Sequence, residues 1–110
     1  MRYALLLYEN DDERVVKSDA EVGDCLAYAA AMEKAGILVG GERLRPAWSA
    51  TTVAVAGGRT QVLDGPYAEA KEQLGGFHII DVPDLDAALA WAQRSPSAVR
   101  GRVEVRPIWP

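Results

Sequence analysis

The residues best suited to chemistry lie in one charged segment, 64–72. Asp64 follows a run of strand-forming residues and precedes Gly65-Pro66, so the sequence predicts its carboxylate at the end of a strand. A carboxylate in that place can serve as a general base or anchor a ligand. It can equally form an Asx turn, in which the side chain accepts backbone N–H groups of the next residues. The sequence leaves both interpretations open.

Glu69, Lys71 and Glu72 follow closely in the same segment. On a helical turn, Glu69 and Glu72 share one face. Together with Tyr67 and Lys71 they are suited to frame a polar pocket for a small molecule. A solvated surface turn, whose charges pair with one another, explains the same pattern.

Two further charged residues lie on expected strands. Glu42 follows Gly40-Gly41, where close backbone approach lets a carboxylate face the interior; an edge strand protected by a charge is the alternative. Arg106 alternates with Val105 and therefore points to the opposite face of its strand. We expect Arg106 to pair with Glu42 or Asp64 across the fold, or to bind an anionic ligand through both guanidinium nitrogens.

His78 is the only histidine, and it shares a strand face with Ile80 and Val82. A histidine there is either a hydrogen-bonded core residue or a partner of Asp64 in proton transfer. With Cys25 the only cysteine, the chain has too few ligands for a zinc site. No glycine-rich phosphate loop joins a strand to a helix. We therefore expect no metal, nucleotide or flavin cofactor.

Length and composition narrow the possible classes of protein. The 110 residues suit a single domain over residues 1–110, and 49% hydrophobic with 25% charged residues is typical of a globular chain. The net charge of −4 argues against nucleic acid as a partner. The apolar run Ala4–Leu7 is too short to cross a membrane. A lone cysteine and the lack of a targeting segment predict a cytoplasmic protein.

The hydrophobic periodicity and the turn residues predict which elements position these side chains. A helix begins after the capping box Ser18-x-x-Glu21 and ends before Gly36, and a second helix begins after Asp84 and ends at Ser95-Pro96. The expected strands are Arg2–Tyr8, Ile37–Leu44, Phe77–Val82 and Arg102–Ile108, with a hairpin of Thr51–Ala56 and Arg59–Leu63 about Gly57-Gly58 and short helical turns over Tyr67–Gln73.

This order of elements predicts an α+β fold, a ferredoxin-like split βαββαβ arrangement with an inserted β-hairpin. Two helices cover only one face of such a sheet. The strand runs LLL, FHII and VEV nevertheless place apolar residues on both faces. A second copy of the chain is the simplest cover for the other face, so we expect a homodimer.

The segment 64–77, DGPYAEAKEQLGGF, resembles the DGPF-domain branch of the YCII-related family. Similar patterns occur at Gly40-Gly41-Glu42 and in the closing segment VEVRP, so the resemblance covers nearly the whole chain. Tyr67 replaces the usual Phe of the motif. The resemblance implies a dimeric α/β barrel with two sheets packed face to face. It also implies that some relatives act on small ring compounds with a His–Asp pair, and that genes of this branch often neighbour those of extracytoplasmic-function sigma factors.

Two classes of function follow. The first is an enzyme that acts on a small organic molecule by proton transfer, with Asp64 as the base and His78 or Lys71 as its partner. Its polar pocket would lie near the dimer interface. The remaining residues that we expect to bind the ligand are Glu42, Tyr67, Glu72 and Arg106. The second class is a non-catalytic ligand-binding or regulatory module, linked to a sigma-factor pathway.

Overall fold

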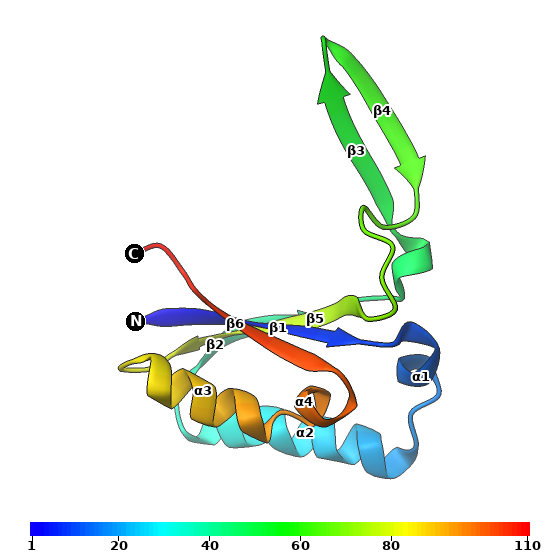
Figure 1. Cartoon of the computed structure of the whole chain (residues 1–110). Coiled ribbons are helices and arrows are strands. Elements are labelled where there is room, and N and C mark those ends of the chain that lie inside the picture. The colour runs from blue at the N-terminus through cyan, green and yellow to red at the C-terminus, as the bar shows by residue number, and fades with distance from the viewer.

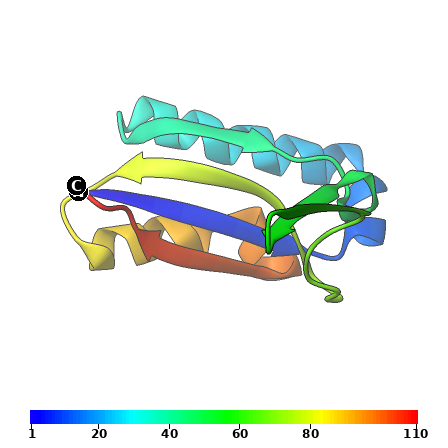
Figure 2. The same ribbon diagram turned by 90° about the horizontal axis from the view of Figure 1, so that it is seen from above.

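The computed structural model describes residues 1–110 and contains one four-stranded and one two-stranded antiparallel sheet. The larger sheet has the strand order β2-β5-β1-β6, and every neighbouring pair is antiparallel (Figure 2). Its strands are β1 (Arg2–Glu9), β2 (Leu38–Arg43), β5 (Gln73–Asp81) and β6 (Arg102–Pro107). The helices α2 (Asp19–Lys34) and α3 (Leu85–Arg94) lie on one face of it (Figure 1). This is a ferredoxin-like α+β arrangement.

Side-chain caps fix where the two long helices begin. The Ser18 hydroxyl accepts a hydrogen bond from the Glu21 backbone N–H at 3.2 Å, and the Glu21 carboxylate accepts one from the Ser18 N–H at 3.3 Å. Asp84 accepts from the Ala87 N–H at 2.9 Å. Each cap satisfies donors that the first helical turn leaves free. Both predicted helix starts are therefore confirmed.

The hydrophobic core lies between the helices and the sheet. On β1, the alternate residues Tyr3 and Leu5 point toward the helices and are 3% and 0% exposed. They pack with Met32 of α2 and Ile80 of β5, both fully buried. Burial of such a side chain contributes about 1.5–3 kcal/mol. The opposite face of the sheet has no helix against it (Figure 1).

The two-stranded sheet projects from that helix-free side (Figure 1). It consists of β3 (Thr51–Ala56) and β4 (Arg59–Asp64), joined by Gly57-Gly58 with φ of 57° and 75°. Positive φ at both positions fits the tight turns that glycine favours. We call residues 51–64 the arm. A 3₁₀ turn, η1 (Ala47–Ser49), leads into it.

Two local predictions were wrong. No helix forms over Tyr67–Gln73; instead, the Gln73 side-chain amide donates to the carbonyl oxygens of Ala68 and Ala70, which holds an irregular loop. Strand β5 begins at Gln73 rather than Phe77, because Gln73 and Leu74 already pair with the end of β1.

Two short helices were also missed, α1 (Asp11–Val15) and α4 (Pro96–Arg100). We expected Ser95-Pro96 only to end a helix, but Pro96 is the first residue of α4. Proline suits this position because the first helical N–H has no partner to lose.

Candidate functional site

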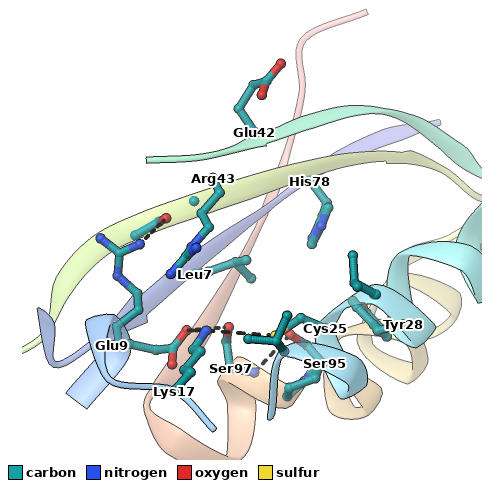
Figure 3. A pocket seen from close by; sticks show the side chains of 16 residues that line it. Leu7, Glu9, Lys17, Cys25, Tyr28, Glu42, Arg43, His78, Ser95 and Ser97 are labelled. Atoms are coloured by element: carbon teal, nitrogen blue, oxygen red, sulfur yellow. Dashed lines mark hydrogen bonds and ion pairs between the residues drawn. The ribbon is translucent and has the colours of Figure 1, made fainter. Parts of the chain in front are cut away.

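A cavity of about 220 Å³ lies between the sheet and α2 (Figure 3). Gly76 of β5 lines it and lies opposite Arg43 of β2, and Gly41 of β2 lies opposite His78 of β5. Since Gly76 has no side chain, space remains beside Arg43 on the helix-facing side of the sheet.

His78 points from β5 toward α2 and lines the cavity (Figure 3). Its Nδ1 atom is buried and has no hydrogen-bond partner. Burial lowers the pKa of His78 below its usual 6.5, so the imidazole is neutral near pH 7. A neutral imidazole in a cavity can accept a proton from a bound molecule and, as the imidazolium so formed, return it.

Two neighbours fix the position of the His78 ring. The Tyr28 ring of α2 meets it edge to face, with 5.8 Å between the ring centroids. The Tyr28 hydroxyl donates to the Trp91 carbonyl oxygen at 2.7 Å, and burial raises the pKa of Tyr28 to about 12, so it stays protonated. On the other side, a Cβ at Gly41 would overlap the Phe77 carbonyl oxygen and come within 3.0 Å of His78 Cδ2. Glycine is therefore required there.

A buried charge network forms another wall of the cavity. Glu9, at the end of β1, has a side chain only 6% exposed. Its carboxylate accepts a hydrogen bond from the Ser97 hydroxyl at 2.9 Å. Lys17 and Arg100 lie 3.7 Å and 3.8 Å from its oxygens. These contacts compensate for the desolvation of the Glu9 carboxylate.

Arg14 of α1 closes the cavity near the first residues of β5, and its role there is structural. Its guanidinium donates to Asp11 at 3.1 Å, to the Leu44 carbonyl oxygen at 2.7 Å and to the Gly75 carbonyl oxygen at 3.3 Å. A Cβ at Gly75 would lie 2.8 Å from Arg14 Nε. Gly75 therefore gives this buried arginine its space.

Arg43 differs from Arg14 and Lys17, the other cations that line the cavity, because its side chain is exposed and has no ion pair or hydrogen bond. Its side chain points from β2 into the cavity, whereas that of the adjacent Glu42 points away from it (Figure 3). This alternation follows from the pleat of the strand. Arg43 thus offers a free guanidinium to whatever occupies the cavity.

The structure brings few of the sequence-predicted site residues together. His78 and Glu42 both line the cavity, but the Glu42 carboxylate points to the helix-free side of the sheet (Figure 3). Asp64 ends strand β4 of the arm, and its carboxylate accepts no hydrogen bond, so the Asx turn does not form. Tyr67 is 92% exposed in the loop that follows.

The other predicted residues also lie outside the cavity. Lys71 is exposed in the loop, and Glu72 pairs with Arg102 at 3.3 Å. Arg106 pairs with Glu104 of its own strand, and within the chain it forms no pair with Glu42 or Asp64. The reason is that Glu104, two residues away, shares its strand face with Arg106 and is the nearer acid.

Sequence reasoning missed most of the polar cavity wall. The residues concerned are Glu9, Arg14, Lys17, Arg43 and Ser97. The usable signal was the strand alternation at Glu42-Arg43, which requires one of the two side chains to face the helices. The paired glycines, Gly40-Gly41 and Gly75-Gly76, also indicated a place where the sheet leaves room.

Neither a metal site nor a membrane span was found. No three His, Cys, Asp or Glu side chains are grouped so that they could hold a metal ion. None of the helices is long and apolar enough to cross a bilayer.

Comparison with known proteins gives two matches. The model of the YCII-related domain family matches residues 1–110. An uncharacterised protein of Rhizobium meliloti (strain 1021) is 38% identical over 120 aligned residues, which cover 98% of this chain and 92% of that protein.

Proposed function

The chain belongs to the YCII-related domain family, and on this premise we propose that it binds a small organic molecule in the cavity beside α2 and exchanges a proton with it through His78. The observation that carries this proposal is the buried Nδ1 atom of His78, which has no partner within the chain. Buried polar groups in proteins nearly always have a hydrogen-bond partner. A bound molecule would supply the missing one.

The chemistry fits the state of the imidazole. Because burial lowers its pKa, His78 is present as the free base near pH 7 and can take a proton from an acidic C–H or O–H group. Tyr28 and Gly41 limit the movement of the ring. The imidazole itself is half-buried, which strengthens electrostatic interactions at the ring relative to those in water.

A non-catalytic ligand-binding module is the second candidate, and one observation favours it. No carboxylate is hydrogen-bonded to His78. In histidine bases such a partner commonly fixes the tautomer and stabilises the imidazolium. Without it, the same cavity would bind a ligand but transfer protons slowly.

The single histidine makes the test direct, because its ring signals in an NMR spectrum need no assignment. Addition of phenol, benzamide or benzoate is expected to shift the His78 ring signals in a saturable way. Deuterium uptake from D₂O by phenylpyruvate, which has an acidic C–H group, then separates the two candidates. Faster uptake with the wild type than with His78→Gln supports catalysis. Equal uptake with retained binding supports the binding module, and unchanged His78 signals with every probe would contradict both.

We further propose that the chain forms a homodimer through the helix-free face of the sheet and the arm. The radius of gyration of 15.6 Å exceeds the roughly 13 Å typical of a compact chain of this length. The accessible surface of 7543 Å² exceeds the roughly 6,000 Å² expected for this mass by about 1,500 Å². A standard interface buries about 800 Å² on each partner, so the excess is sufficient for a stable dimer.

The remaining sequence-predicted residues belong to this second proposal. Asp64 and Arg106 lie on the arm and on β6, and Tyr67, Lys71 and Glu72 lie in the segment that connects the arm to β5. In a dimer that covers the helix-free face, they would form a polar rim around its apolar centre.

A further inference from the structure

We propose that the ligand of the cavity is a small carboxylic acid, bound as its monoanion with the carboxylate on Arg43 and the apolar body against α2. This inference rests on the proposed function, since it names the class of molecule that occupies the cavity. It rests on four features of the cavity: the unpaired guanidinium of Arg43, the N–H donors of Lys17, the apolar side chains in the wall and the cavity volume.

Among the cations around the cavity, Arg43 alone lacks a carboxylate partner. Glu42 also lines the cavity and is unpaired, but its carboxylate points away from it. Three other cations at or beside the cavity each have a carboxylate partner. These pairs are Arg14 with Asp11 at 3.1 Å, Arg100 with Glu21 at 2.9 Å, and Lys17 with Glu9 at 3.7 Å. Arg43 has none, although the chain as a whole carries a net charge of −4. One unmatched guanidinium fits one carboxylate, which it can bind through two parallel N–H···O bonds.

Lys17 offers a second donor inside the cavity. Its side chain is 9% exposed, yet its nearest acceptors are the Glu9 carboxylate at 3.7 Å and the Cys25 sulfur at 3.8 Å. An ammonium has three N–H donors and normally places them on oxygen within about 3.2 Å. A carboxylate or another oxygen of the ligand would satisfy this buried cation.

The rest of the cavity is apolar and small. Leu7 lines it from the sheet, and Val22 and Leu26 line it from α2, where they remain 43% and 67% exposed. An apolar ligand body would cover them, which is favourable by about 25 cal/mol for each Å² buried. The volume of about 220 Å³ lies below the roughly 300–1,000 Å³ of sites for drug-sized ligands, so the acid must be small.

Benzoate and benzamide are matched probes, because they have nearly the same shape and differ in charge. The measurement is the saturable shift of the His78 ring signals in the intact protein. We expect benzoate to bind at least tenfold more tightly than benzamide. Arg43→Gln should weaken the binding of benzoate at least tenfold and leave the binding of benzamide unchanged. Arg43→Lys should retain part of the affinity for benzoate. Arg59→Gln, which removes an equal charge from the arm, is the control and should change neither.

The remaining outcomes separate this inference from the proposed function. Equal binding of both probes, or benzoate binding that Arg43→Gln leaves unchanged, would overturn the carboxylate inference and keep the cavity as a small-molecule site. Displacement of benzoate by inorganic phosphate at equal concentration would contradict the inference that the ligand is a carboxylate monoanion. If neither probe nor phenol shifts the His78 signals, the inference and the proposed function both fall.

Discussion

Leu5 and Leu6 are adjacent residues of one type on β1, and they point to opposite faces of the same sheet. Leu5 faces the helices and is fully buried, whereas Leu6 lies half-buried on the helix-free face. Leu6 is paired with Phe77 on the neighbouring strand β5, so the apolar surface continues across the sheet there. The helix-facing side of the sheet therefore belongs to a complete hydrophobic core, whereas the helix-free side presents an apolar surface that no helix covers.

The charged residues of the two faces differ in the same way. On the helix side, Glu9 is buried among Ser97, Lys17 and Arg100. On the free face, the pair of Glu104 and Arg106 is open to solvent, with side chains 42% and 67% exposed. A salt bridge in water contributes little, whereas a buried carboxylate depends on its partners. Charged groups of the same type therefore contribute differently to the free energy of unfolding on the two faces.

The largest expected effect is the loss of core packing on the helix side. Leu5→Ala should lower the free energy of unfolding by about 4 kcal/mol, because it removes a fully buried side chain and leaves a cavity. Leu6→Ala is the matched control and should cost less than about 1 kcal/mol in the monomer. Urea unfolding at low protein concentration measures both. Equal losses would mean that the two faces are equally packed within one chain.

The second effect concerns the buried carboxylate. Glu9→Gln should lower the free energy of unfolding by about 3 kcal/mol, because it leaves Lys17 and Arg100 without their shared counter-charge. Glu104→Gln, which breaks the exposed pair on the free face, should cost less than about 1 kcal/mol. Thermal or chemical unfolding of the two variants tests the difference. Similar losses in both would show that burial does not separate the two networks.

The third effect tests whether a second copy covers the free side. Val62 and Gln61 are adjacent on the arm and point to its opposite faces; Val62 lies beside Val53, and both are about 60% exposed. Val62→Lys should weaken the proposed dimer at least about tenfold, since an unpaired ammonium resists burial. Gln61→Lys, with the same added charge, should leave the dimer nearly intact. Sedimentation that gives a monomer for the wild type at micromolar concentration would contradict the dimer itself.

The smallest expected effect is a change of folding stability with pH, which arises from His78 on the helix side of the sheet. Well above pH 6.5, His78 is neutral in both the folded and the unfolded chain. As the pH falls below 6.5, the unfolded chain takes up a proton that the folded chain resists, because burial lowers the folded pKa. Stability should therefore fall from pH 7 toward acid, and this fall should be smaller in His78→Phe. Identical melting-temperature profiles for the two proteins would contradict the buried neutral imidazole.

The two faces also differ in how far the sequence predicted them. The helix caps and the strand alternation act over a few residues. Together with the order of elements they predicted the α+β architecture and the uncovered apolar face. The family resemblance rested on the motif of residues 64–77, and the family was confirmed. Local rules failed where long-range pairing prevailed, as in the extension of β5 back to Gln73.

The candidate site was mostly beyond those rules. The sequence nominated Asp64, Tyr67 and Lys71 because they form a dense charged motif, but the cavity lies on the other side of the sheet. Of the predicted residues only His78 and Glu42 line it, and the Glu42 carboxylate points away from it. Glu42 was chosen over Arg43, although strand alternation alone cannot say which of the two faces the helices.

The sequence by itself determined the two long helices with their caps, the approximate positions of the strands, the family and the apolar character of both sheet faces, because periodicity and turn chemistry are local properties. Tertiary structure alone decided which charges meet. Glu9 and Ser97 are 88 residues apart in the chain and 2.9 Å apart in the fold. Arg43 and Gly76 become neighbours only through the β2–β5 register. Charge pairing and cavity shape depend on such long-range contacts, which packing of the whole chain selects and no local pattern encodes.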